Sequence, residues 1–256
     1  MDSHTAVMLF LAGIGGGMLT ALVGGAAVVT YPALIAAGIH PLAATTCNLT
    51  ASFPGAMFAA LSDRRQLPAF DRGFVSMILA SMFGAGCGAA LLLLTPQRVF
   101  TVLVPLLLGF STLLFALSGP IGAWLRTRAA KKGREIDFSL GNLKMLLPVS
   151  FYGGYFGAGV GVLLLGVMSV ATEGDYRSAN VAKNLVTSLN SGTAAAIFVA
   201  QGTIVWPQTL ALMAGSIVGG LAGATLARIA PRRLMRIAVI AVGAALTAYF
   251  AQRYWF

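Results

Sequence analysis

The fold is decided by the stretch Gly153-Gly154-Tyr155-Phe156-Gly157-Ala158-Gly159-Val160-Gly161 and, in the first half of the chain, by Gly13-Ile14-Gly15-Gly16-Gly17 with Gly24-Gly25 after it. Each lies in an apolar segment, about residues 142–172 and 5–37, that is too long for one comfortable membrane crossing and too short for two. Glycine is a poor helix former and lets backbones approach closely. Each segment is therefore predicted to be broken or re-entrant, with two half-helices joined by a turn at membrane depth.

The composition excludes a soluble globular protein. Of 256 residues, 58% are apolar and only 9% are charged, so there are too few ionised side chains to cover a water-exposed surface. The net charge of +10 does not indicate a nucleic-acid partner, because the basic residues form short clusters between long charge-free runs. About twenty apolar residues suffice for a helix to cross about 30 Å of hydrocarbon. The charge-free runs are residues 3–62, 73–97, 99–125, 145–172, 184–227 and 237–252.

The apolar runs and the break signals between them predict eight helical segments, at about residues 5–37, 41–62, 70–94, 97–118, 142–172, 176–201, 206–227 and 232–252. The chain is thus predicted to be all-α and a polytopic integral membrane protein. No basic region precedes the first apolar run, so this segment is expected to belong to the mature protein. Two Cys and two His form no disulfide framework or metal motif, and no cofactor or metal is expected.

The two halves of the chain resemble each other. The matched positions are Gly16-Gly17 with Gly153-Gly154, Asn48 with Asn184, Ser52 with Ser188, Gly84 with Gly219, Gly88 with Gly223 and Pro96 with Pro231. This pattern predicts two transmembrane repeats of four segments each, at residues 1–118 and 142–256. A basic linker at residues 119–141, expected in the cytoplasm, joins them.

Charge asymmetry predicts how the repeats are oriented, since Lys and Arg accumulate on the cytoplasmic side of short loops. If all eight segments cross the membrane, the better orientation places ten basic residues inside and six outside. If the first and fifth segments are re-entrant, fourteen lie inside, and only Arg98 and Arg253 lie outside. We therefore predict an inverted repeat with both termini outside.

A polar stripe runs along the sixth segment, where six polar side chains recur at helical spacing: Asn180, Lys183, Asn184, Thr187, Ser188 and Ser191. The second segment carries a matching, less polar face. A polar stripe within hydrocarbon must face protein or water, so it either holds helices together or lines a transport path. Recurrence in both halves favours the path. The substrate-binding candidates on the two faces are Asn48, Ser52, Asn180, Lys183, Asn184, Thr187 and Ser188.

Lys183 is the one cation within a predicted span, which by default marks a functional site. It lies about seven residues into its helix, roughly 10 Å from the start at 1.5 Å per residue. Its long side chain could therefore either face the substrate or extend to the cytoplasmic surface. Glu173, Asp175 and Arg177, just before it, are expected to form a solvated cluster rather than a proton relay.

The glycine breaks predict an anion site. A half-helix that begins inside the membrane points unpaired N–H groups and a positive dipole end into the protein. Close helix packing is the alternative role of the glycines, and we favour it for residues 84–88 and 219–223. For the breaks we favour binding. The glycines that we expect to contribute are Gly16, Gly17, Gly24, Gly25, Gly157, Gly159 and Gly161.

Several of these features together resemble the sulfite exporter (TauE/SafE) family of bacterial membrane permeases, over nearly the whole chain. They are Tyr31-Pro32, the Asn-xxx-Ser second segment, residues 151–159, Trp206-Pro207 and the stretch from Gly219 to Pro231. Two positions depart from the family pattern, since Ser169 stands where a second proline is typical and Val160 interrupts a glycine run. The resemblance implies secondary transport of small anions, especially sulfite and organosulfonates, across the inner membrane.

Transport by alternating access is the favoured function, with one repeat rocking against the other around a fixed site. The expected partners are a small anionic substrate, the lipid bilayer and a coupling ion, either a proton or sodium; the oligomeric state stays open. A membrane sensor or accessory subunit of sulfur metabolism that does not transport is the alternative. An enzyme is disfavoured, because no nucleophile, base and orienting group can be assembled from the in-membrane residues.

Overall fold

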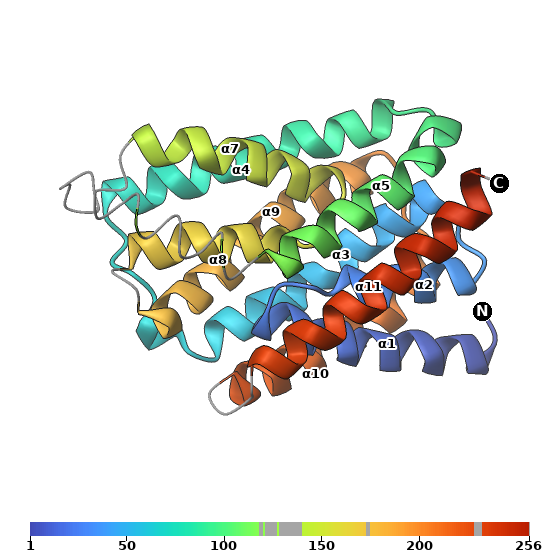
Figure 1. Ribbon diagram of the computed structural model, residues 1–256, viewed down its shortest axis with the longest axis horizontal. Helices are drawn as coiled ribbons and strands as arrows, with labels where there is room; N and C mark the ends of the chain where they lie inside the picture. The colour runs from blue at the N-terminus through green and yellow to red at the C-terminus, as the bar shows by residue number, and fades with distance from the viewer. Residues whose placement is uncertain (118–119, 121–126, 128–139, 173–174, 228–231, 256) are drawn as a thin grey trace.

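The protein is all-helical in the computed structural model, which describes residues 1–117, 120, 127, 140–172, 175–227 and 232–255 (Figure 1). Within these residues there is no strand. The predicted basic linker at residues 119–141 lies almost entirely outside them.

Helices begin and end within a few residues of the predicted segments. The first half contains α1 (Ser3–Leu22), α2 (Ala27–Ala36), α3 (Pro41–Leu61), the short 3₁₀ helix η1 (Arg64–Gln66), α4 (Arg72–Leu94) and α5 (Gln97–Ala116). The second half contains α7 (Leu140–Tyr155), α8 (Val160–Ala171), α9 (Tyr176–Ala200), α10 (Trp206–Leu226) and α11 (Arg232–Trp255).

The first and fifth segments are broken, as the glycine pattern predicts. Residues 23–26 separate α1 from α2, and residues 156–159 separate α7 from α8. Gly24 adopts φ 84°, and Gly157 and Gly159 adopt φ 78° and 73°, in the left-handed region that other residues rarely occupy. The parts are unequal, because α1 has 20 residues and α2 only 10. The first segment is therefore a long helix with a short return rather than two similar halves.

Most helices run along the long axis of the molecule, and both termini lie at the same end (Figure 1). We call this the termini end. Four exposed arginines mark the other end, which we call the basic end: Arg64, Arg65, Arg72 and Arg177. α2 packs back against α1 and α8 against α7, so each broken segment forms a hairpin.

Helices from the two halves interdigitate. α1 packs against α10 of the second half, and α7 packs in the same way against α4 of the first. α3 contacts α9 and α10, α9 contacts α3 and α4, and α5 contacts α11. These pairings are unchanged when each helix is exchanged for its counterpart in the other half, such as α1 for α7 or α3 for α9.

Small residues make the two cross-half contacts close. A side chain at Gly84 or Gly88 of α4 would collide with backbone atoms of α7, and one at Gly219 of α10 would collide with the backbone of Ile14 in α1. This confirms the packing role favoured for these glycines, since helices in lipid associate through small residues that let backbones approach.

The surface is that of a membrane protein. Four of the described helices, α1, α4, α5 and α10, are long and apolar enough to cross a membrane. Large apolar side chains are exposed on the outside, including Leu79 at 61%, Phe83 at 70% and Leu94 at 79%. α3 and α9 have 21 and 25 residues but carry polar stripes, which face the interior. The polar stripes of α3 and α9 therefore lie between helices, inside the molecule.

Candidate functional site

The polar stripe of α9 is buried along its whole length. Its members are Asn180, Lys183, Asn184, Thr187, Ser188 and Ser191, and each is less than a tenth exposed. Apolar residues on the other sides of α9, such as Val181 and Val186, are buried as well, so the predicted polar face meets protein and not lipid. Its side chains bond α1 and α3.

Lys183 binds the end of α1. Its side chain is 0% exposed, and Nζ donates to the carbonyl oxygens of Thr20, at 2.8 Å, and Ala21, at 3.4 Å. Extension to the cytoplasmic surface, one of the two alternatives, is therefore wrong. The last carbonyls of a helix have no intrahelical partners and carry partial negative charge, so a cation is favourable there.

Other side chains of α9 bind the same helix end. Asn180 Nδ2 donates to Ala21 O at 3.0 Å, Asn184 Nδ2 donates to the same oxygen at 3.5 Å, and the Tyr176 hydroxyl donates to Leu22 O at 3.2 Å. The sequence prediction considered only the amide ends of the broken helices. The structure shows that the stripe of α9 meets the carbonyl end of one.

Three oxygen atoms of the stripe have no hydrogen-bond partner among the described residues: Asn180 Oδ1, Asn184 Oδ1 and Thr187 Oγ1. Because both Asn side chains direct Nδ2 to Ala21 O, their Oδ1 atoms are left to accept bonds from elsewhere. Buried polar atoms are almost always paired with protein, water or ligand. These acceptors therefore mark a place where water or a ligand with a donor can bind.

The matching face of α3 lies opposite. Asn48 is buried and accepts a 2.5 Å hydrogen bond from Thr30 Oγ1 of α2, while Ser52 is half-buried. Ser188 Oγ of α9 donates to Phe53 O of α3 at 3.1 Å. Asn48 thus holds α2, the short return helix, much as Asn184 holds α1. The two Asn-xxx-Ser faces both contact a broken segment.

The two breaks meet inside the molecule. A Cβ atom added to Gly24 would overlap the Cα atom of Gly161, and a Cβ atom added to Gly161 would overlap the Cα atom of Gly24. Gly25 packs on Phe115, Gly157 on Leu49 and Gly159 on Ser111. The two breaks are therefore in direct contact and leave no room for an anion between them.

Gly16 and Gly17 lie in the continuous part of α1 and not at the break. A side chain at Gly16 would meet Thr30 of α2, and one at Gly17 would meet the backbone of Ser216 and Gly219 in α10. Their contacts are those of close helix packing. Neither lines the cavity described next.

A cavity of about 370 Å³ lies at the basic end. The ends of α3 and α10 and the first turns of α9 line it, with Ala59, Asp63, Asp175, Tyr176, Arg177, Asn180, Val181, Asn184, Ala224 and Ala227. The volume falls within the range of small-molecule sites, roughly 300 to 1,000 Å³. Among the described residues, no three His, Cys, Asp or Glu side chains gather to hold a metal ion. The cavity's chemistry is that of amides, an arginine and carboxylates.

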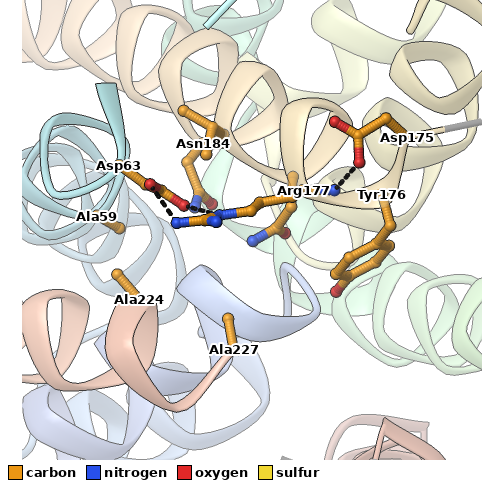
Figure 2. Close-up of a pocket in the computed structure, with 10 residues that line it drawn as sticks. Ala59, Asp63, Asp175, Tyr176, Arg177, Asn184, Ala224 and Ala227 are labelled. Atoms are coloured by element: carbon orange, nitrogen blue, oxygen red, sulfur yellow. Dashed lines mark hydrogen bonds and ion pairs between the residues drawn. The ribbon is translucent and has the colours of Figure 1, made fainter. Parts of the chain in front are cut away.

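Arg177 and Asp63 form an ion pair at the surface of this cavity (Figure 2). Arg177 Nε lies 2.6 Å from Asp63 Oδ2, and Nη2 lies 2.8 Å from Oδ1. Asp175 caps α9 by accepting from the backbone N–H groups of Arg177 and Ser178. Arg177 was expected in a solvated cluster with Asp175 and Glu173, the latter outside the described residues. No sequence signal joins it to Asp63, which is 114 positions away.

Comparison with known proteins supports a transport function. The family model described as sulfite exporter TauE/SafE matches residues 9–250. The chain is 28% identical to a probable membrane transporter protein, ORF9, of Sinorhizobium sp., over 95% of this chain and 91% of that one. It is 26% identical to a probable membrane transporter protein of Haemophilus influenzae, over 94% of this chain and 92% of that one. No solved structure matches the chain.

Proposed function

Because the chain belongs to the sulfite exporter TauE/SafE family, we propose that this multi-pass membrane protein is a permease for a small oxyanion in the bacterial inner membrane. Sulfite is the expected substrate from the description of the family, and the resemblance noted in the sequence adds organosulfonates. The observation that carries the proposal is the cavity beside Asn184. Arg177 lines this cavity at the surface, and the buried amides of Asn180 and Asn184 line it further in. Lys183 is buried next to Asn184.

The charges around the cavity favour an anion. A helix end carries about half an elementary charge, negative at its carboxyl terminus. In its protonated form Lys183 places a full positive charge at the end of α1, and about half a positive charge is then left beside Asn184. Nearer the surface, Arg177 and the amino end of α9 add positive charge, which Asp63 and Asp175 offset. Lys183 thus supplies net attraction although its Nζ is bound to carbonyl oxygens.

The amide ends of α2 and α8 are the second part of the proposed site. Both begin at the breaks, where Gly24 and Gly161 touch. Helix amino termini bind anions through free N–H groups and the helix dipole. We place the substrate there, with Gly25, Gly157 and Gly159 around it, when Gly24 and Gly161 separate. The cavity is then the access path from the basic end, and it leads past the Asn184 and Ser188 face.

Alternating access fits the symmetry of the packing. Helix pairings that survive exchange of the two halves, with α1 starting at the termini end and α7 at the basic end, support an inverted repeat of residues 1–118 and 142–256 (Figure 1). Arg64, Arg65, Arg72 and Arg177 at one end against Arg98 and Arg253 at the other support a cytoplasmic basic end. Inverted repeats with broken helices are the common design of secondary transporters.

The test is counterflow in proteoliposomes with the full-length protein, using labelled sulfite and a panel of sulfate, thiosulfate, sulfoacetate and carboxylates. We expect Asn184→Ala to abolish flux while the protein stays monodisperse. Asn190→Ala is the matched control on the same helix, since Asn190 bonds Ser81 and does not line the cavity. Anion binding without counterflow by the wild type would contradict transport and favour the sensor or accessory subunit. Equal flux in the Asn184 and Asn190 variants would reject the site.

A further inference from the structure

The ion pair at the cavity has the geometry of oxyanion binding. The guanidinium of Arg177 donates two nearly parallel hydrogen bonds, from Nε and Nη2, to the two carboxylate oxygens of Asp63. A planar guanidinium binds carboxylate, phosphate and other oxyanions through the same fork of donors. Sulfite and sulfonate groups also present pairs of oxygens. The carboxylate therefore stands where the head group of such a substrate would bind.

We propose that Arg177 is an oxyanion-binding residue at the mouth of the cavity and that Asp63 is a tethered competitor which occupies it until substrate arrives. The proposal rests on the permease function proposed above and adds the first binding step to it. An arriving anion displaces the Asp63 carboxylate from the guanidinium. When the anion moves deeper into the cavity, Asp63 binds Arg177 again and the ion pair is restored for the next anion.

Exposure makes this exchange feasible. The side chain of Arg177 is 50% exposed and that of Asp63 is 15% exposed, so an anion from solution can reach the guanidinium. Because the guanidinium is half exposed, solvent screens its attraction to the carboxylate more than in a fully buried pair. A substrate anion can therefore compete with Asp63 for the guanidinium.

Other contacts hold the start of α9 when the ion pair opens. Asp175 caps the helix, and Ser178 Oγ donates to Gln66 O of η1 at 2.7 Å. The backbone at Arg177 is thus fixed by bonds that do not involve its guanidinium. Opening the pair frees a side chain and leaves the helix in place.

The residues that follow Arg177 extend the binding surface inward. Asn180 and Asn184 come three and seven positions later, on the same helical face, and both line the same cavity. Their buried Oδ1 atoms have no partner among the described residues. The face thus runs from the guanidinium at the surface to two amides, one and two turns deeper, whose Nδ2 groups bond Ala21 O and whose Oδ1 atoms can accept from a donor group of the ligand. Both amides share the carbonyl oxygen of Ala21 with Lys183 at the end of α1.

The experiment compares Asp63→Asn with Arg177→Gln in purified full-length protein, with sulfite as the probe and its Kd measured by calorimetry or thermal shift. Both variants break the same ion pair. If Asp63 competes with substrate, Asp63→Asn lowers the Kd by about two- to fivefold, the strength of an exposed pair, whereas Arg177→Gln raises it. The double variant should then bind as weakly as Arg177→Gln alone.

Asp71→Asn is the matched control, because Asp71 is an acid at the same end that caps α4 through Phe74 N and does not line the cavity. Asparagine is also a good cap, so the Kd should not change. If both variants raise the Kd for sulfite equally, the ion pair has only a structural role, and the proposal is overturned. A wild type that binds sulfite but shows no counterflow would instead contradict the permease function. These two failures are therefore distinct.

Discussion

The ammonium of Lys183 in α9 lies 2.8 Å from the carbonyl oxygen of Thr20, near the last turn of α1. A cation from the second half of the chain thus caps the helix at which the first half is broken. This contact joins the two features that the sequence marks most strongly, the in-span lysine and the glycine break. The electrostatics of the site depend on it.

Replacement of Lys183 by methionine should abolish anion binding without unfolding the protein. The loss of capping bonds and the relief of ammonium desolvation oppose each other, so the melting temperature should change by only a few degrees. With Lys183 protonated in the wild type, the charge beside the cavity changes from about half positive to about half negative, and the Kd for sulfite should rise at least about tenfold. Lys183→Arg keeps the charge and should retain most binding. Unchanged Kd in Lys183→Met would show that the charge does not act on the substrate.

Alanine at Gly24 should be more damaging than alanine at Gly38. Both glycines have positive φ, 84° and 82°, so both substitutions cost about 1–2 kcal/mol of backbone strain. A Cβ at Gly38 meets nothing within 4 Å, whereas one at Gly24 overlaps Gly161 and adds about 1–3 kcal/mol of overpacking. Thermal melts in detergent measure the difference. Equal melting temperatures would mean that the contact between the breaks is not tight.

Substrates that carry a hydrogen-bond donor should be preferred. Asn180 Oδ1, Asn184 Oδ1 and Thr187 Oγ1 are buried and unpartnered among the described residues, and a ligand without a donor leaves them so. We expect 2-hydroxyethanesulfonate to compete with sulfite about tenfold better than ethanesulfonate, since an unsatisfied buried acceptor costs about 1–3 kcal/mol. Thr187→Val removes one of the three acceptors at nearly constant side-chain shape. It should therefore reduce the difference in affinity between the two sulfonates. Equal competition by the two sulfonates would contradict this role of the amides.

The helices and their breaks could be predicted because each is marked locally. Charges, prolines and glycines stand at the helix ends, and Gly24, Gly157 and Gly159 stand where the chain needs positive φ. The buried face of α9 could also be predicted, because spacing along one helix determines which side chains share a face. In all these cases the cause lies within a few residues of the effect.

The parts that were missed depend on contacts between distant segments. Nothing near Lys183 in the sequence indicates that it meets the carbonyls of Thr20 and Ala21, since helix ends look alike until the neighbours are known. The pairing of Arg177 with Asp63 joins residues 114 positions apart. Gly17 was expected at a binding site, but the break lies six residues later and Gly17 packs on α10. A glycine that permits a bend and one that permits close packing are identical in sequence.

The close contacts made by glycines between helices of the two halves, which we call glycine seams, limit which helices can move together. Gly84 and Gly88 hold α4 to α7, and Gly219 holds α10 to α1, with backbones too close for any added side chain. Any rigid body that keeps these seams intact must combine helices from both halves. In the alternating access proposed above, each moving body would therefore contain helices of both halves, and the expected rocking of one half against the other would break these contacts.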